Sequence, residues 1–307
     1  MKKNLKPSTL CVRGGWEPKN GEPVQPPIVQ STTFKYDNSE EMAMLFDLKK
    51  EGYFYTRLQN PTNDNVAKKI AALEGGVGAM LTSSGQAANF YAVFNICEAG
   101  DHIVTSNEIY GGTYNLFGVT MKKLGIECTF VNPESSEEEI QKAFRPNTKV
   151  LFGETISNPG CKVLDIEKFA RIAHKNGVPL IIDNTFATPI NCRPFEWGCD
   201  IVTHSTTKYM DGHATQVGGC VVDSGNFDWD AHARTDNSRR VVPRTYIHKG
   251  LRQDGLHDQT HGTADARSRL YTVAAECFLA QPRARDTRTA RAPALRQRPE
   301  GGRVSAQ

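Results

Sequence analysis

Short apolar runs alternate with amphipathic segments between residues 66 and 222 of the 307-residue chain. Apolar runs of roughly four to eight residues bounded by Gly, Pro or Asp indicate buried strands, whereas apolar residues three or four positions apart indicate helices. On this pattern we predict helices over 66–74, 86–96, 114–124, 137–144 and 166–176. The seven strands predicted around them cover 78–83, 102–106, 127–131, 149–155, 179–183, 201–204 and 218–222.

The alternation of strands and helices sets the expected fold class and the expected place of a ligand. Strands joined by helices of this length form crossover units, so we predict an α/β fold with a mostly parallel, seven-stranded sheet between helices. Ligands of such sheets bind at the carboxyl ends of the strands. Three polar segments follow predicted strands in this way, namely 83–86, Asp183 and the loop that carries Lys208.

Residues 1–60 lack this alternation, and we predict that they form an extended N-terminal arm. Prolines at positions 7, 18, 23, 26 and 27 interrupt helical hydrogen bonding, and the segment 28–34 is short and β-prone. An arm of this kind can reach a second subunit. The main domain is then expected to cover 61–233.

The composition excludes several classes of protein. No apolar run approaches bilayer-spanning length, and no apolar segment follows the basic N-terminus, so we expect neither a membrane span nor a secretory signal. The eight cysteines, at positions 11, 97, 128, 161, 192, 199, 220 and 277, show no Cys-x-x-Cys spacing. Scattered cysteines of this kind indicate reduced thiols in a cytoplasmic protein, and no metal site is expected.

The net charge of +3 conceals an asymmetry between the two ends of the chain. Residues 1–233 carry 17 Lys, 5 Arg and 27 acidic residues, which give a net charge of −5. Residues 234–307 carry 1 Lys, 14 Arg and 7 acidic residues, which give a net charge of +8. Most basic residues are lysines up to residue 233 and arginines after it, so segment 234–307 differs from the rest of the chain in composition and in the sign of its net charge.

Lys208 and Asp183 are the strongest candidates for chemistry. Lys208 lies in a His-Ser-Thr-Thr-Lys-Tyr run at 204–209, directly after a predicted strand. An amine beside small hydroxyl residues suits a Schiff base with pyridoxal phosphate (PLP), because the hydroxyls can bind the phosphate. Asp183 ends an earlier strand and can keep the pyridine nitrogen protonated, which makes the ring an electron sink. Taken alone, a lysine after Ser and Thr is most often a surface residue.

Weaker signals lie elsewhere along the chain. The Ser-Gly-Gln segment 84–86 joins a strand to a helix whose free amides can bind a phosphate. Tyr110 can stack on a flat ring, Arg57 has the fork geometry for a phosphate, and Asn158 can hydrogen-bond a cofactor or a substrate carboxylate. The ordinary alternatives are a turn, a loop tyrosine, a surface arginine and an Asn-Pro turn.

In this order the signals resemble the Cys/Met metabolism PLP-dependent enzymes, the cystathionine γ-synthase-like family of fold type I. The resemblance runs from about Thr9 to Ala233. Its motifs are the segments 26–34, 55–62, 73–76, 83–88, 110–114, 183–189 and 204–209. Within the family the chain is most similar to the sulfhydrylases of O-acetyl-L-homoserine, so the resemblance implies a PLP-binding large domain over 61–233.

The resemblance also implies a reaction in methionine and cysteine biosynthesis (transsulfuration). The γ-acetyl group of O-acetyl-L-homoserine would be replaced by sulfide or a thiol, giving homocysteine or methionine and acetate. Cystathionine γ-synthase and methionine γ-lyase activities are alternatives, and a non-catalytic remnant with a basic tail is another. Small-molecule substrates, a homo-oligomer built as a dimer of dimers, and no nucleic-acid or membrane partner are expected.

Family roles can be carried over to the matching catalytic positions. Lys208 is implied to bond covalently to the cofactor and later to shuttle protons. Asp183 is implied to pair with the pyridinium nitrogen, and Tyr110 to stack on the ring and assist proton transfer. Asn158 is implied to position cofactor and substrate.

The implied phosphate site draws on two subunits. The backbone amides of Gly85 and Gln86 would bind the phosphate together with Ser205 and Thr207. Tyr55 and Arg57 would complete the site from the neighbouring subunit. Ser84 and Thr185 belong to the same set of cofactor-binding candidates.

The resemblance stops after Ala233, where the family continues with a C-terminal α/β domain. That domain is expected to carry an arginine that binds the substrate carboxylate. Here it is missing or replaced by the Arg-rich segment 234–307, for which a frameshift near codon 234 is one hypothesis and a divergent, disordered tail another. A basic tail that binds nucleic acid is the third. We expect the chain as written to be a poor enzyme with intact PLP-binding residues.

Overall fold

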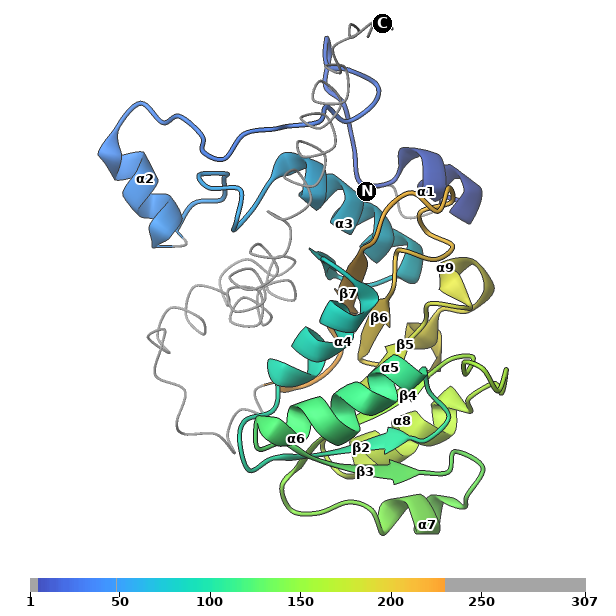
Figure 1. Ribbon diagram of the computed structural model, residues 1–307. Coiled ribbons are helices and arrows are strands. Elements are labelled where there is room, and N and C mark those ends of the chain that lie inside the picture. The colour runs from blue at the N-terminus through green and yellow to red at the C-terminus, as the bar shows by residue number, and fades with distance from the viewer. Residues whose placement is uncertain (1–4, 48, 230–307) are drawn as a thin grey trace, which may run out of the picture.

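The computed structural model describes residues 5–47 and 49–229, which are built around one seven-stranded sheet (Figure 1). The strands are β1 (Gly78–Thr82), β2 (His102–Ser106), β3 (Glu127–Val131), β4 (Thr148–Glu154), β5 (Leu180–Asp183), β6 (Ile201–His204) and β7 (Gly219–Asp223). Each predicted strand is present, with ends that agree to within one residue. The predicted α/β fold class is therefore confirmed.

The strand order across the sheet is β1-β7-β6-β5-β4-β2-β3. The pairings of β2 with β3 and β4, of β4 with β5, and of β5 with β6 are parallel. By contrast, β7 runs antiparallel to both of its neighbours, β1 and β6. The sheet is thus mostly parallel, and the carboxyl ends of β2, β4, β5 and β6 lie at one edge of it.

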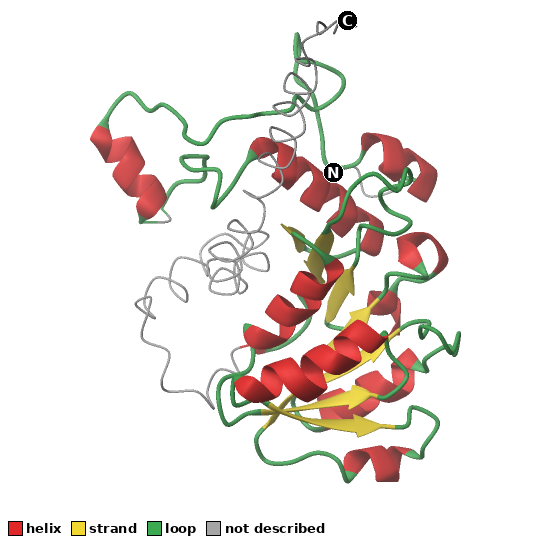
Figure 2. Ribbon diagram, in the orientation of Figure 1, coloured by secondary structure: helices red, strands yellow, loops and turns green. Residues whose placement is uncertain are grey.

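Helices cover both faces of the sheet (Figure 2). One face packs against α3 (Pro61–Glu74), α7 (Glu137–Gln141) and α8 (Ile166–Lys175). The other face packs against α4 (Gly85–Phe94) and a continuous helical stretch formed by α5 (Gly111–Asn115), a π-helical turn (Leu116–Thr120) and α6 (Met121–Lys123). The short α9 (Thr188–Asn191) and a 3-10 turn (Pro194–Trp197) lie between β5 and β6.

Alternation along the strands decides which side chains meet which helices. On β5, Leu180 and Ile182 belong to the core beneath α3 and α8, whereas Ile181 belongs to the core beneath α4. Full burial of each such side chain contributes roughly 1.5–3 kcal/mol. Because side chains alternate with a period of two, the next residue, Asp183, is directed to the α4 face.

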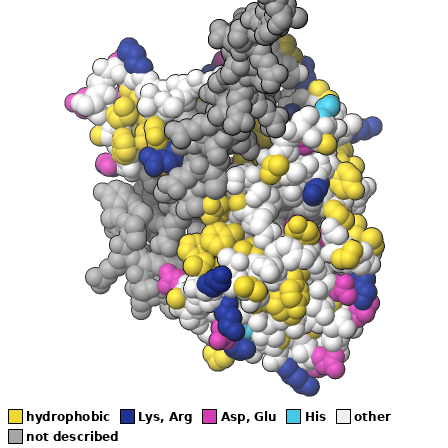
Figure 3. Space-filling view, viewed as in Figure 1, with side chains coloured by type: hydrophobic (Ala, Val, Ile, Leu, Met, Phe, Trp, Pro, Cys, Tyr) yellow, Lys and Arg dark blue, Asp and Glu magenta, His cyan; other side chains and the backbone are white. Residues whose placement is uncertain are grey.

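The N-terminal arm differs from the extended segment that we predicted. It contains two short helices, α1 (Pro7–Arg13) and α2 (Ser39–Phe46). Pro7 occupies the first turn of α1, where a missing N–H costs nothing, so it begins a helix instead of interrupting one. The helix α2 projects from the rest of the chain (Figure 1), and hydrophobic side chains are exposed on it (Figure 3).

The structure does not describe residues 230–307, so the three hypotheses for segment 234–307 lie outside the described residues. Among the helices that the structure does describe, none is long and apolar enough to cross a membrane.

Candidate active site

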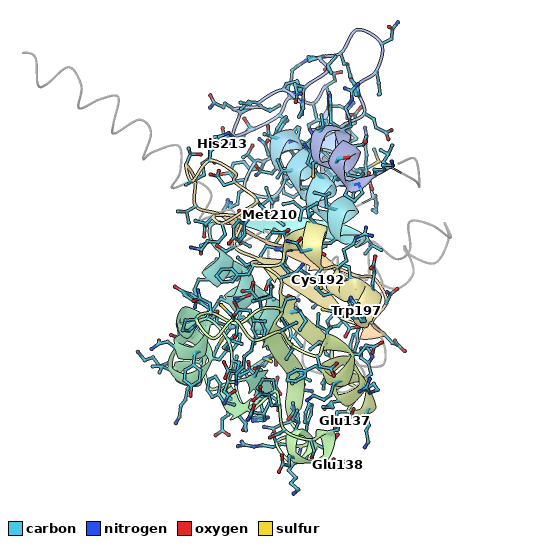
Figure 4. All side chains as sticks on the ribbon, turned by 90° about the vertical axis from the view of Figure 1, so that its right-hand side faces the viewer. Glu137, Glu138, Cys192, Trp197, Met210 and His213 are labelled. Carbon is cyan, nitrogen blue, oxygen red and sulfur yellow. The ribbon has the colours of Figure 1, made fainter. Side chains whose placement is uncertain are left out.

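Lys208 lies on the loop that joins β6 to β7, and its side chain is exposed. Its backbone N–H donates to the Ser205 carbonyl at 3.2 Å, which forms a tight turn directly after β6. The loop continues through Met210 and His213 (Figure 4). Within residues 5–47 and 49–229, no hydrogen bond or ion pair engages the Lys208 Nζ atom. The amine is therefore available to a small molecule at the carboxyl edge of the sheet.

Thr207 closes the base of this loop. Its backbone N–H and its hydroxyl both donate to the Gly218 carbonyl, at 3.3 and 3.1 Å, and its hydroxyl accepts the Gly218 N–H at 3.0 Å. The hydroxyl that we predicted to bind a phosphate is therefore already paired within the protein. The neighbouring Ser205 hydroxyl has no hydrogen-bond partner in the described part of the chain.

Asp183 is buried at the end of β5, and three hydrogen bonds fix its carboxylate. Its Oδ2 atom accepts from the Asn89 side-chain amide at 2.9 Å. Its Oδ1 atom accepts from the backbone N–H and the hydroxyl of Thr185, at 3.1 and 2.5 Å. Donors of this kind stabilise the charged form of a carboxyl. The sequence analysis missed Asn89, which lies one turn after Gln86 on the same face of α4.

Thr185 connects Asp183 to the loop that carries the lysine. While its hydroxyl donates to Asp183, the same oxygen accepts the backbone N–H of Ser205 at 2.8 Å. The two strand ends are also in register, since Asp183 pairs with Thr203 across β5 and β6. The carboxylate and the start of the Lys208 loop therefore hold a fixed relative position.

The start of α4 supplies free donors beside this loop. Ser84 caps the helix by accepting the Ala87 N–H at 3.1 Å, and the amides of Gly85 and Gln86 have no acceptor among the described residues. A Cβ atom at Gly85 would lie 2.4 Å from the Ser205 Cβ and 2.7 Å from its Cα. Glycine at this position thus allows the helix start and the lysine loop to approach, and the free amides form an anion site.

Tyr110 stands at the start of α5 with its ring half exposed. A Cβ atom at Gly112 would lie 2.4 Å from the Tyr110 Cε1 atom, so the ring position requires a glycine there. The Gln86 side chain donates to the Gly112 carbonyl at 3.0 Å and joins α4 to α5. An exposed aromatic face therefore lies beside the free amides at the start of α4.

Glu154 is a member of the site that the sequence analysis did not assign. It ends β4, is buried, and accepts the Tyr110 N–H through Oε2 at 2.6 Å. Burial, together with the charge of Asp183, raises the pKa of Glu154 to about 8. An acidic residue at the end of the apolar run 150–152 was the available signal, since Asp183 ends β5 in the same way.

A second buried group lies on the opposite face of the sheet, beneath α3. The Glu74 Oε1 atom contacts the His204 Nε2 atom at 2.6 Å and accepts from the Asn184 side chain at 2.9 Å. Both members of the Glu74–His204 pair are buried. Because Asn184 follows Asp183 and His204 precedes Ser205, this carboxyl holds the strand ends that carry the site.

Three predicted residues are not joined to the others. Asn158 is half-buried in the turn after β4, and its side chain makes no hydrogen bond to another candidate within the described residues. The Arg57 guanidinium lies 4.9 Å from the centre of the Tyr55 ring on the segment before α3. Neither Arg57 nor Tyr55 hydrogen-bonds the remaining candidates in the part of the chain that the structure describes. Their predicted roles stay predictions.

The donors at this edge of the sheet fit pyridoxal phosphate. The unpaired amides at the start of α4 and the Ser205 hydroxyl suit a phosphate, and the Gly85–Ser205 approach leaves no room for a side chain there. The oriented Asp183 carboxylate suits a protonated ring nitrogen, and the exposed Lys208 amine suits a covalent bond to the aldehyde. The fold and this donor set define the class as an α/β enzyme that depends on pyridoxal phosphate.

Comparison with known proteins identifies the family. The model of the family described as Cys/Met metabolism PLP-dependent enzyme matches residues 8–249, so the chain belongs to this family. The matched range ends beyond residue 233, where the sequence analysis placed the end of the resemblance.

Curated relatives and solved structures support the same family. An O-acetyl-L-homoserine sulfhydrylase of Leptospira meyeri is 44% identical over 230 residues, which cover 75% of this chain and 52% of that protein. One of Corynebacterium glutamicum is 50% identical over 203 residues, which cover 66% and 46%. A solved structure from Campylobacter jejuni, assigned as an O-acetylhomoserine (thiol)-lyase with N'-pyridoxyl-lysine-5'-monophosphate, has a TM-score of 0.71 and 37% identity. It is matched over 73% of this chain and 53% of its own. The chain spans about half the length of these relatives.

Proposed function

We propose that this chain forms the PLP-binding part of an enzyme that replaces the γ-acetyl group of O-acetyl-L-homoserine. The incoming group is sulfide or a thiol, and the products are homocysteine or methionine and acetate. The observation that carries the proposal is the placement of an exposed lysine and a buried, triply hydrogen-bonded aspartate at adjoining strand ends. The substrate in this proposal is taken from the two relatives that are named O-acetyl-L-homoserine sulfhydrylases.

Each residue has a defined task in this proposal. When bound, pyridoxal phosphate supplies a ring that accepts electrons from a bond to the substrate carbon. Asp183 would hold a proton at the ring nitrogen, and its three hydrogen bonds within the described residues orient the carboxylate for this contact. Thr185 orients Asp183 through its hydroxyl. The half-exposed Tyr110 side chain would cover one face of the ring and exclude water from it.

The anchoring residues come from two elements. The amides of Gly85 and Gln86 and the Ser205 hydroxyl bind the phosphate, and Ser84 shapes the helix start by capping it. Lys208 would hold the cofactor aldehyde through its Nζ atom and would move protons at the substrate carbons. Asn158 orients the substrate, and Thr207 stabilises the loop that carries Lys208.

The remaining candidates, Tyr55 and Arg57, would complete the site from a second subunit. Tyr55 and Arg57 lie on the arm before α3 and are not linked by hydrogen bonds to the other candidates within the described residues. An arginine suits a phosphate, so we assign these two side chains to the site of a neighbouring copy in a homo-oligomer, a dimer of dimers. The free thiols of the cysteines at 11, 97, 128, 161, 192, 199 and 220 support a cytoplasmic, reducing setting.

Cofactor binding is tested on the full 307-residue chain. Addition of pyridoxal phosphate should produce a yellow protein, and borohydride reduction followed by peptide mass analysis should place a pyridoxyl group on Lys208. Reduction onto a different lysine would contradict the site. The reaction is tested separately by measuring acetate released from O-acetyl-L-homoserine with sulfide, with cysteine, or without an acceptor. Acetate release that depends on sulfide supports the proposal. Release that depends on cysteine indicates a cystathionine γ-synthase, and release without an acceptor indicates a lyase.

A further inference from the structure

Glu154 and Asp183 form a pair of carboxyl groups at the ends of two neighbouring strands. They are register partners across the parallel pairing of β4 and β5, so their side chains leave the same face of the sheet. Both are buried, with exposed fractions of 5% and 8%. Two negatively charged carboxylates on neighbouring strands repel each other, and burial weakens the screening of this repulsion by water. One of the two carboxyl groups is then expected to keep a proton.

The hydrogen bonds decide which group keeps the charge. Asp183 accepts three hydrogen bonds, from Asn89 and from the amide and hydroxyl of Thr185. Within the described part of the chain, Glu154 accepts one hydrogen bond, from the backbone N–H of Tyr110 at 2.6 Å. Donors stabilise a carboxylate, so Glu154, the member of the pair with one donor, is the one expected to keep a proton.

We propose that Glu154 is a positioning residue that carries a proton in the folded protein, so that its neutral carboxyl fixes the backbone of Tyr110 and leaves the charge of the pair on Asp183. This inference rests on the proposed function, in which Asp183 binds the ring nitrogen and Tyr110 covers the ring. A neutral Glu154 leaves one negative charge opposite the ring nitrogen. If both Glu154 and Asp183 were ionised, their repulsion would favour the uptake of a proton by one of the two carboxylates.

The electrostatics of the surroundings agree with this assignment. The titratable group whose charge acts on Glu154 is Asp183, its register partner on β5. Burial and the Asp183 charge raise the pKa of Glu154 to about 8, against the opposing effect of the Tyr110 N–H. At neutral pH the group is then mostly protonated.

The contact with Tyr110 explains why a glutamate stands here. Tyr110 is the N-cap residue of α5, and its side chain makes no capping hydrogen bond. The Glu154 carboxyl accepts the N–H at the point where the chain turns from β2 into this helix, so it fixes the residue whose ring faces the cofactor site. A buried N–H without an acceptor would loosen this turn.

Infrared spectroscopy of the 307-residue chain without cofactor measures the proton directly. At neutral pH, the spectrum of the wild type minus that of Glu154→Gln should contain the C=O band of a protonated carboxylic acid. In the wild type, this band should fade as the pH rises through about 8. The subtraction removes Asp200, a second carboxyl whose pKa burial raises. A difference spectrum that shows a carboxylate band in place of the acid band would overturn the proposal. Glu108→Gln, which removes a partly exposed carboxylate paired with Lys162 at 3.1 Å, is the matched control and should not change the acid band.

The positioning role is tested by cofactor titration. Glu154→Leu removes the acceptor and should weaken pyridoxal phosphate binding by about tenfold. Glu154→Gln keeps a neutral acceptor of the same size and should restore most of that loss. If Gln binds as weakly as Leu, a neutral carboxyl at this position is not what fixes Tyr110. Failure of the wild type to bind pyridoxal phosphate would refute the proposed function and leave the infrared result standing.

Discussion

Replacing Gly112 with alanine should separate the folding of this chain from the binding of its cofactor. Gly112 lies inside α5, and a Cβ atom added there would approach the Tyr110 ring to 2.4 Å at Cε1, 3.0 Å at Cζ and 3.1 Å at Cδ1. The atoms that it meets belong to the end of a side chain that can rotate. The expected response is a displaced Tyr110 ring in an unchanged helix.

The substitution should affect the free energy of unfolding and the affinity for the cofactor in different directions and by different amounts. Gly112 lies in the first turn of α5, where alanine gains less over glycine than the roughly 0.5–1 kcal/mol of a helix interior, so the free energy of unfolding should stay constant or rise slightly. Loss of an aromatic stacking contact costs about 0.5–1.5 kcal/mol. Since 1.4 kcal/mol corresponds to a tenfold change in Kd, the Kd for pyridoxal phosphate should rise roughly two- to twelvefold.

The assay pairs a urea titration with a cofactor titration, and the neighbouring glycine provides the control. A Cβ atom at Gly111 would meet no atom of the described residues within 4 Å, so Gly111→Ala should change neither the Kd nor the spectrum of the bound cofactor. In a Tyr110→Ala background, Gly112→Ala should add no further loss, because the two changes act through one ring.

Two results would refute this reasoning. If Gly112→Ala lowers the free energy of unfolding by more than about 1 kcal/mol, the Tyr110 ring cannot rotate away from the new Cβ atom and the helix backbone is displaced instead. If the Kd of Gly112→Ala equals that of Gly111→Ala, the position of the Tyr110 ring does not contribute to binding.

Three further predictions concern single side chains. Lys208→Ala should abolish both the yellow colour and the borohydride adduct, whereas Lys175→Ala, which removes an exposed lysine at the end of α8, should leave both in place. Glu74→Leu should lower the free energy of unfolding by about 3–5 kcal/mol, because it removes one partner of the buried pair with His204, and urea denaturation would measure the loss. A raised pKa in the folded state means that the stabilising contribution of Glu154 is complete below its unfolded pKa and disappears as the pH rises through about 8. The stability of the wild type relative to Glu154→Gln should therefore fall by about 1.4 kcal/mol per pH unit between about pH 5 and 8, and a flat difference would show that Glu154 titrates normally.

The sheet could be predicted from the sequence because its strands are local apolar runs. Each of the runs around Val150, Ile181 and Val202 is short, bounded by polar or turn residues and buried on both faces, so pattern alone locates it. The arm was predicted less well. Pro7 was interpreted as a helix breaker, although proline in the first turn of a helix is favourable.

The polar contacts of the site could not be predicted in the same way. Asn89 and Asp183 are 94 residues apart, and Glu74 and His204 are 130 residues apart. No local periodicity links such positions, because the contacts exist only after α3 and α4 pack on opposite faces of the sheet. The positions of Lys208 and Asp183 at strand ends were predictable, since the strands themselves were.

The position of β7 between β1 and β6 determines when this site can form during synthesis. β1 is hydrogen-bonded to β7, and the paired residues are 137 (Thr82 and Gly219) to 145 (Gly78 and Asp223) positions apart. Pairing of strands so far apart is slow, since a long segment must be closed before any contact forms. Among the described residues β1 pairs only with β7, so until the ribosome has released β7 the start of α4, which follows β1, is not yet held against Ser205. The anion site is thus among the last parts of the described chain to assemble, although Gly85 is made early.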